Sequence, residues 1–413
     1  MTNLKFIEKC EEALAEKFKI IDETAYFNQK KVLNAFRDCN IAVRHFNGST
    51  GYGYGDEGRD TLGKLYAQVF GSEAGIVSPH LLSGTHALTV ALFGILRPSD
   101  TVLCITGMPY DTLRGVIFGE NNGSLKDFGI NFEYCNLTDA GSFDLTEIDK
   151  KLNDKVKIVY IQRSRGYELR DAFSCGEIGE ICEFVRKCGF NGCIFVDNCY
   201  GEFVEKIEPS EAGADIIVGS LIKNAGGGFA PTGGYICGKE KYIDLIGKRL
   251  TAPSIGLEVG SYEQSYRNFY QGLFMAPHTV AQSLKTSLLI GKAMGVLGYK
   301  NYPSLDKTPY DITRAIQFDD ADKMVDFIRE VQYASPVDGF VTCEPWDMPG
   351  YDDKIIMAAG TFVSGASIEL SADGPVKPPY IAYFQGGLTY EHGKYALERI
   401  LNKLVGELHF DKC

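Results

Sequence analysis

Short apolar runs alternate with amphipathic segments between residues 75 and 240. The apolar runs are 75–79, 101–105, 156–162, 193–198, 214–220 and 233–238. Segments with helical periodicity lie between several of them, for example CGEIGEICEFVRKC at 175–188. Strands and helices that alternate at this spacing predict βαβ units and a mostly parallel sheet with helices on both faces. In an α/β sheet of this kind, ligands bind at the carboxyl ends of the strands.

The two ends of the chain follow other patterns. The first residues, MTNLKFIEKCEEALAEKF, predict an amphipathic helix, and the glycine- and tyrosine-rich segment 47–58 predicts an ordered loop. Further segments are expected as helices at 60–70, 277–298, 319–330 and 390–407, a linker at 300–311, and strands at 354–363, 366–370 and 380–384. We therefore expect an N-terminal helix and loop (1–60), a large α/β domain (61–298) and a small α+β domain (299–413).

Composition and charge narrow the class of protein. The chain has 413 residues and a formal net charge of −12, which argues against nucleic acid or an anionic membrane surface as the main partner. No stretch approaches twenty apolar residues, and the charged N-terminus lacks the apolar core of a signal peptide. We expect a soluble, cytoplasmic protein. The twelve cysteines and six histidines show no zinc-type spacing, so reduced thiols and no metal site are expected.

A carboxylate and a lysine follow neighbouring apolar runs. Asp197 ends the run in FVDNCYGEF, and Lys223 lies just beyond the next run, in ADIIVGSLIKN. Parallel strands would bring both side chains to one edge of the sheet. Catalysis by pyridoxal 5′-phosphate (PLP) requires such a pair, since a lysine binds the cofactor aldehyde as a Schiff base and an aspartate keeps the pyridine nitrogen protonated. Taken alone, the two residues could equally form a surface salt bridge.

Polar residues around this pair suit a phosphate. Ser83, Gly84 and Thr85 open a helical run after the first strand, where backbone N–H groups and hydroxyls meet the positive end of the helix dipole. Ser220 lies three residues before Lys223. Seen in isolation, the Ser-Gly-Thr turn is an ordinary helix cap. Tyr110 follows the strand at 101–105 and could stack on the pyridine ring, or be an ordinary half-buried tyrosine.

The combined pattern SGT…PYDTLRG…VDNCYGEF…GSLIKNAGG…GGY resembles the cystathionine- and methionine-γ-lyase branch of fold-type I PLP enzymes. More closely, GYGYGDEGRDTL, IQRSRGY, SLIKNAGGG and RLTAPSIGLE resemble the methionine-γ-lyase-like family often labelled aluminium resistance protein. The resemblance runs from about residue 25 to the C-terminus. It implies the aspartate-aminotransferase-like fold, PLP as cofactor and a homodimer or homotetramer with shared active sites.

The resemblance also implies roles for single residues. Lys223 would carry the cofactor and move the α-proton, Asp197 would hold the pyridinium, and Tyr110 would stack on the ring and assist the leaving group. The phosphate would be held by Ser83, Gly84, Thr85 and Ser220. Tyr52, Tyr54 and Arg59 would reach the phosphate in the neighbouring subunit's site. Tyr200 would fit an aminotransferase as well, where a tyrosine at this position commonly reaches the cofactor O3′.

The substrate side departs from the lyase pattern. The lyases carry Ser-Pro-x-Asn-Pro after the middle strand, whereas here residues 162–167 read QRSRGY, and the C-terminal stretch YIAYFQGGL lacks the lyases' carboxylate-binding arginine. Arg163, Arg165 and Arg249 are candidates for binding the substrate carboxylate. Each of the three could equally be a structural ion pair.

These observations favour a PLP-dependent carbon–sulfur lyase that eliminates from the β or γ carbon of a sulfur amino acid such as cystathionine, cysteine or methionine. The fold alone does not fix the reaction, so an aminotransferase or a replacement enzyme remains an alternative. A PLP-binding stress-response protein with little turnover is a further alternative. A dinucleotide-binding protein is disfavoured, because no G-x-G-x-x-G lies between a strand and a helix.

Overall fold

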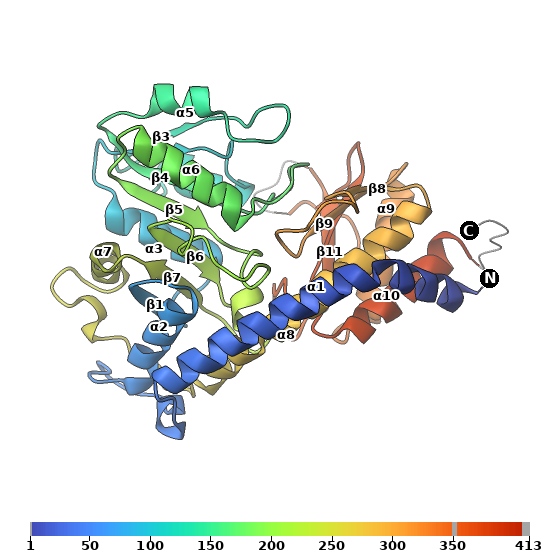
Figure 1. The fold of residues 1–413 in the computed structure, drawn as a ribbon, viewed down its shortest axis with the longest axis horizontal. Helices are drawn as coiled ribbons and strands as arrows, with labels where there is room; N and C mark the ends of the chain where they lie inside the picture. The colour runs from blue at the N-terminus through green and yellow to red at the C-terminus, as the bar shows by residue number, and fades with distance from the viewer. Residues whose placement is uncertain (1, 349–352, 407–413) are drawn as a thin grey trace.

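The computed structural model describes residues 2–348 and 353–406, arranged around two sheets joined by two long helices (Figure 1). The large sheet has seven strands in the order β1-β7-β6-β5-β4-β2-β3. Their bounds are β1 Ala74–Ser78, β2 Thr101–Cys104, β3 Asn131–Tyr134, β4 Val156–Gln162, β5 Cys193–Asp197, β6 Ile216–Ser220 and β7 Gly234–Gly238. Neighbouring strands are parallel except in the two pairs made by β7. The expected mostly parallel α/β sheet is confirmed.

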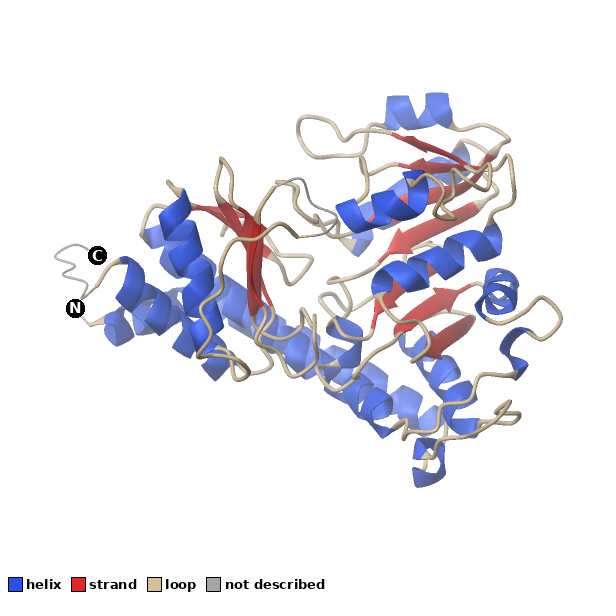
Figure 2. Cartoon of the chain, turned by 180° about the vertical axis from the view of Figure 1, so that it is seen from behind, coloured by secondary structure: helices blue, strands red, loops and turns tan. Residues whose placement is uncertain are grey.

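Both faces of this sheet are buried, which explains its continuous apolar runs. Successive residues of β4 point into two separate cores: Ile158 and Tyr160 into one, Val159 and Ile161 into the other. One core is closed by α3 (Gly84–Ile95), α4 (Asp111–Phe118) and α7 (Glu240–Leu250), the other by α2 (Glu57–Val69), α5 (Leu145–Lys151) and α6 (Cys175–Lys187). Figure 2 shows the helices on either side of the strands.

Two long helices connect the large sheet to the small one. Helix α1 (Asn3–Asp38) packs along α8 (Arg267–Val296), and both run from beneath the large sheet to the C-terminal part (Figure 1). Lys285 on α8 pairs with Asp22 on α1 at 2.5 Å. Short 3-10 turns lie at Val43–Phe46 (η1), Asn224–Gly226 (η2) and Gly256–Glu258 (η3). None of the helices within the described ranges is long and apolar enough to cross a membrane.

The C-terminal part is a five-stranded antiparallel sheet in the order β10-β11-β12-β9-β8. Its strands are β8 Lys300–Tyr302, β9 Arg314–Gln317, β10 Ile355–Ala358, β11 Ser371–Pro375 and β12 Ile381–Gln385. Helices α9 (Ala321–Ala334) and α10 (Tyr390–Leu404) pack together, with α9 against this sheet. Ala315, Ile381 and Tyr383 form a separate small core with Tyr167, so the opposite face of the sheet meets the large domain.

Several predicted elements differ from the structure. The segment 366–370, expected as a strand, forms bends instead, because the buried carboxylate of Glu369 accepts hydrogen bonds from the N–H groups of Phe362 and Val363 at 2.9 and 3.0 Å. The expected linker 300–311 begins with strand β8, and the edge strand β3 was not predicted, since its residues are half or fully exposed and show no apolar run. Residue 407, the predicted end of the last helix, lies outside the described residues.

Candidate active site

Asp197 and Lys223 meet at the carboxyl edge of the large sheet. Asp197 is the last residue of β5, Lys223 follows the neighbouring parallel strand β6, and both line one cavity of about 440 Å³. The Asp197 carboxylate is almost fully buried and accepts hydrogen bonds from the Cys199 N–H at 3.2 Å and the Tyr160 hydroxyl at 3.4 Å. Burial raises the pKa of Asp197, and the charge of Lys223 opposes that rise. A ligand that brings its own positive charge to Asp197 would keep this carboxylate ionised.

Lys223 is held beside an aromatic ring. Its Nζ lies 4.0 Å from the centroid of the Tyr200 ring. Tyr200 has a φ of +73°, a conformation that L-residues adopt rarely, and the turn is fixed by Asn224, whose side-chain amide donates to the carbonyls of Tyr200 (2.9 Å) and Glu202 (3.0 Å). Burial lowers the pKa of Lys223, but the surrounding groups, Asp197 among them, outweigh it and raise the pKa above its usual value.

The same cavity also offers donors for an anion. Ser83 caps helix α3, its Oγ accepting from the His86 N–H at 3.1 Å, and the first turn through Gly84 and Thr85 leaves N–H groups without helical partners. A Cβ on Gly84 would lie 3.4 Å from the Ser220 Cβ, so the two segments are in direct contact. The structure therefore brings the predicted phosphate residues together although they lie far apart in the sequence.

Tyr110 joins these residues at the cavity wall. Its hydroxyl lies 3.2 Å from Thr85 Oγ1, and its backbone N–H donates to Gln162 Oε1 at 3.1 Å. Burial raises the pKa of the Tyr110 hydroxyl, so this group keeps its proton at neutral pH. Tyr110 is therefore a protonated hydroxyl in the same cavity as Lys223.

Arg165 is buried in the cavity wall with unused donors. Its side chain is 1% exposed, and none of its three guanidinium nitrogens has a hydrogen-bond partner among the described residues. Its ion-pair contact, to Asp311 Oδ2, is long at 4.0 Å, and that carboxylate is already engaged by the Ser164 hydroxyl at 2.7 Å. A buried guanidinium without hydrogen bonds is costly, and a ligand carboxylate is the group that fits its planar set of donors.

The other two candidate arginines do not line this cavity. Arg163 is fully buried and uses its nitrogens within the protein, on the carbonyls of Phe173 and Gly201, on Asn198 and on Glu205 at 2.5 Å. Arg163 packs against the turn after β5. A Cβ added to Gly201 in that turn would lie only 2.6 Å from the guanidinium, so the contact is tight. Arg249 lies on α7 with its guanidinium over the Phe93 ring at 5.2 Å. Because neither arginine lines the cavity, we do not expect them to bind the substrate carboxylate. Their contacts within the protein indicate structural roles.

Tyr52, Tyr54 and Arg59 also lie outside their own chain's cavity. The two tyrosines are 68% and 69% exposed, with ring centroids 5.4 Å apart. Arg59 pairs with Asp60 at 2.8 Å and donates to the Gly53 carbonyl at 3.1 Å, which fixes the loop that carries the tyrosines. A contribution of these residues to a neighbouring subunit's site stays a prediction.

Residues of the small domain complete the cavity and were not predicted. Asp373 on β11 and Tyr383 on β12 are cross-strand partners, and both line the cavity together with Gln385 and Thr313. No local sequence signal marks them, because only the packing of the two domains brings this face of the small sheet to the large one. Tyr167, from the segment QRSRGY, also lines the wall and accepts a hydrogen bond from the Tyr383 hydroxyl at its carbonyl oxygen, at 2.5 Å.

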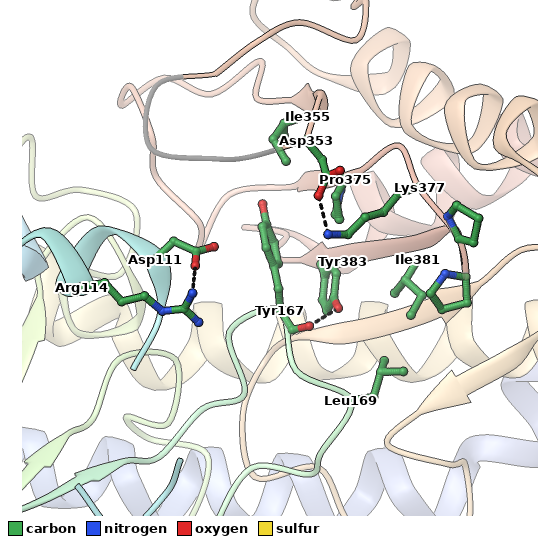
Figure 3. A pocket seen from close by; sticks show the side chains of 12 residues that line it. Asp111, Arg114, Tyr167, Leu169, Asp353, Ile355, Pro375, Lys377, Ile381 and Tyr383 are labelled. Atoms are coloured by element: carbon green, nitrogen blue, oxygen red, sulfur yellow. Dashed lines mark hydrogen bonds and ion pairs between the residues drawn. The ribbon is translucent and has the colours of Figure 1, made fainter. Parts of the chain in front are cut away.

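A second hollow of about 380 Å³, here called the outer chamber, adjoins this cavity. Tyr167, Tyr383, Asp111 and Arg114 line both spaces. In Figure 3 the two tyrosines stand between the Asp111–Arg114 ion pair and the Lys377–Asp353 ion pair. The outer chamber further includes Leu169, Ile355, Pro375, Pro378, Pro379 and Ile381. Asp111 and Arg114 of α4 line it on one side, and residues on and around β10, β11 and β12 of the small sheet line most of the rest.

The side chains of the cavity fit PLP and an amino acid. An amine and a buried carboxylate lie at one edge of the sheet, a helix N-terminus with hydroxyls lines the same cavity, and a guanidinium without a hydrogen-bond partner among the described residues lies in its wall. These groups match, in that order, the aldehyde, pyridine nitrogen and phosphate of PLP and the carboxylate of an amino acid.

Comparisons with known proteins agree with this geometry. The methionine γ-lyase family matches residues 3–405. A Listeria monocytogenes structure, described as a candidate cystathionine β-lyase involved in aluminium resistance, is 49% identical, with a TM-score of 0.96 over 97% of this chain and 100% of that one. A carbon–sulfur lyase involved in aluminium resistance from Clostridium novyi is 47% identical, with a TM-score of 0.94 over 97% and 96% of the two chains.

Other proteins are similar to this chain in sequence. An uncharacterised Bacillus subtilis protein is 50% identical over 390 residues, 94% of this chain and 93% of its own. The L-methionine γ-lyase of Pseudomonas putida is 26% identical over 197 residues, 48% of this chain and 45% of its own. The extent of the family match and the close structural relatives show that the chain belongs to the methionine γ-lyase family and is an enzyme of its PLP-dependent lyase type.

Proposed function

We propose that this protein is a PLP-dependent carbon–sulfur lyase that cleaves a sulfur-containing L-amino acid by β- or γ-elimination. The observation that carries the proposal is the cavity shared by Lys223, Asp197 and Arg165, whose guanidinium has no hydrogen-bond partner among the described residues. Lys223 would hold the cofactor aldehyde and Asp197 its pyridine nitrogen. Ser83, Gly84, Thr85 and Ser220 would hold its phosphate. When bound, PLP supplies a place for the negative charge that develops at the substrate α-carbon.

The chain's own groups divide the remaining work. Arg165 binds and orients the substrate carboxylate with donors that no other described group uses. Lys223 accepts the α-proton with its free amine. Tyr110, whose raised pKa keeps its hydroxyl protonated, gives a proton to the departing sulfur. Tyr383 and Gln385 of the small sheet contribute side chains to the cavity wall beside the reacting groups.

We further propose a homodimer or homotetramer in which the loop of Tyr52 and Tyr54 completes the neighbouring site. Two large, exposed aromatic side chains on an ordered loop are the kind of surface that a subunit contact covers.

The cofactor assignment is tested by colour. The purified protein should absorb at about 420 nm, the region of a protonated PLP–lysine imine, and Lys223→Ala should lose that band. Lys241→Ala, which removes an exposed lysine on α7, is the matched control and should keep it. A wild-type protein that stays colourless after incubation with PLP would refute the assignment.

The reaction is tested by products. Cystathionine, cysteine, methionine and homocysteine are each incubated with the yellow protein. Pyruvate indicates β-elimination, and 2-oxobutyrate from methionine or homocysteine indicates γ-elimination. A 2-oxo acid that forms only with an added amino acceptor would replace the lyase proposal by an aminotransferase. A yellow protein that gives no product with any of these four amino acids would favour the alternative of a PLP-binding stress-response protein with little turnover.

A further inference from the structure

Asp373 places a carboxylate on the small-domain wall of the cavity. It lies on β11 directly opposite Tyr383 on β12, so both side chains project from the same face of the small sheet. Both residues line the cavity that contains Lys223. The sequence gives Asp373 no recognisable motif, and the proposed elimination, as set out above, does not use it.

The environment of Asp373 leaves one of its oxygens without a partner. Oδ1 is buried and has no hydrogen-bond partner, and among the residues that the structure describes Asp373 makes no ion pair. Burial raises the pKa of Asp373 to about 6, and hydrogen bonds from Tyr167 and Gln385 limit the rise. The group is therefore mostly ionised at neutral pH. A buried carboxylate oxygen without a donor is as costly as the unused donors of Arg165, and a ligand cation would satisfy it.

The charges of Arg165 and Asp373 both act on the hydroxyl of Tyr383, and all three residues line the same cavity. Burial raises the pKa of the Tyr383 hydroxyl, the charge of Arg165 lowers it, and the charge of Asp373 raises it, so both charges lie within electrostatic reach of that phenol. A ligand in this cavity that contacts both Arg165 and Asp373 would carry a carboxylate at one end and a cationic group at the other. This is the charge pattern of an amino acid with a second ammonium group on its side chain.

The surrounding space allows such an extended ligand. Tyr383 lines the outer chamber as well as the cavity, and Pro375, two residues beyond Asp373 on β11, lines the outer chamber. The carboxylates of the outer chamber already have cations, since Asp353 pairs with Lys377 and Asp111 with Arg114 (Figure 3). Asp373 thus differs from them in having an oxygen left for a ligand.

We propose that Asp373 is a specificity-determining residue that binds a distal ammonium group, so that the site selects L-amino acids carrying a second cationic group at the end of the side chain. The inference rests on the proposed function, because it takes the α-carboxylate to be bound by Arg165. It predicts that the site binds diamino acids more tightly than amino acids with an uncharged side-chain end, such as methionine.

Ligand binding tests the inference independently of turnover. Dissociation constants of L-ornithine, L-norleucine and L-lysine are measured by calorimetry on the PLP-loaded protein. Norleucine has the chain length of ornithine with a methyl group in place of the side-chain ammonium, and lysine is a longer diamino ligand. We expect the better diamino ligand to bind wild type at least about tenfold more tightly than norleucine, since it gains a hydrogen bond to a buried charged group that norleucine cannot form. Asp373→Asn should abolish the preference and leave the norleucine constant within about twofold.

Two further variants separate the possible outcomes. Asp353→Asn removes a carboxylate that is already paired and should keep the preference, whereas Arg165→Gln should weaken the binding of all three ligands alike. Unchanged melting temperature and circular dichroism establish that Asp373→Asn is folded.

The inference is overturned if wild type binds norleucine as well as the diamino ligands, if it binds none of the three, or if Asp373→Asn keeps the preference. Equal weakening of all ligands in Asp373→Asn would assign Asp373 to the support of Tyr167 and Gln385 and would also overturn it. A wild type that prefers the diamino ligands but releases no 2-oxo acid from any sulfur amino acid would refute the proposed function alone.

Discussion

The side-chain amide of Asn224 donates a hydrogen bond to the carbonyl oxygen of Tyr200 at 2.9 Å. This bond ties the residue after Lys223 to the residue whose ring lies against the Lys223 amine, so one amide sets the positions of both. The amide is buried, and its second donor is used on the Glu202 carbonyl.

Asn224→Asp should therefore disturb Lys223, the lysine proposed to carry the cofactor, without removing it. The carboxylate cannot donate to the two carbonyls and would face their oxygens, which we expect to weaken PLP binding by roughly tenfold or more. Titration of the apoprotein with PLP, followed at about 420 nm, measures the effect. Asn191→Asp, at an exposed turn, is the control and should bind PLP like wild type.

Two neighbouring buried arginines should respond in opposite ways to loss of charge. Arg163→Gln leaves Glu205 and Glu208 without their cation, and we expect a loss of about 3–5 kcal/mol in the free energy of unfolding. Arg165→Gln removes a guanidinium that has no hydrogen bonds, so stability should be unchanged or higher while KM for amino acid substrates rises by about 10²-fold. Denaturant unfolding and steady-state kinetics on both variants measure this. A stability loss in Arg165→Gln as large as that in Arg163→Gln would contradict the assignment of the two roles.

Glu202 should make stability depend on pH. It is buried behind the Lys223 turn, Oε1 accepts from the Tyr235 hydroxyl at 2.9 Å, and Oε2 has no partner among the described residues. Burial raises the pKa of Glu202 to about 8. Between the ordinary carboxyl pKa and about pH 8 the folded protein keeps this proton while the unfolded chain releases it. The free energy of unfolding therefore falls as pH rises through this window, by at most about 1.4 kcal/mol per pH unit from this group.

Glu202→Gln removes that titration. The variant should gain stability relative to wild type as pH rises from about 5.5 to about 7.5, and the difference should level off above about pH 8. Urea unfolding at several pH values measures it, with the exposed Glu180→Gln as the control that should follow wild type throughout. If the difference in the free energy of unfolding between Glu202→Gln and wild type does not vary with pH, the pKa of Glu202 is not raised in the folded protein.

The proposed subunit contact predicts complementation between two inactive variants. Lys223→Ala lacks the cofactor lysine, and Tyr54→Ala lacks the loop tyrosine. If Tyr54 acts in the neighbouring site, a mixed dimer contains one site with both residues intact, and random mixing should restore about a quarter of wild-type activity. If Tyr54 acts within its own chain, every site lacks one of the two residues and the mixture stays inactive. Activity is measured after unfolding and refolding the two variants together.

The sequence by itself determined the large sheet and the part of the cavity that we propose binds the cofactor. Its continuous apolar runs predicted strands buried on both faces, and residues at the ends of these runs, such as Asp197 and Lys223, necessarily meet at one edge because parallel strands share their direction. Ser83 was predicted as a helix cap for the same local reason. These features depend on periodicity, strand direction and helix ends, which a single sequence carries.

The tertiary structure alone decided the part of the cavity that we propose binds the substrate. Arg163 and Arg165 are two residues apart in one segment and look equivalent in sequence. The guanidinium of Arg163 is saturated with internal hydrogen bonds, whereas that of Arg165 has no hydrogen-bond partner among the described residues. Asp373 enters the cavity because the small sheet packs against the large domain through Tyr383 and Tyr167. Burial and the availability of hydrogen-bond partners decide what these charges can do, and both arise only when distant segments are packed together.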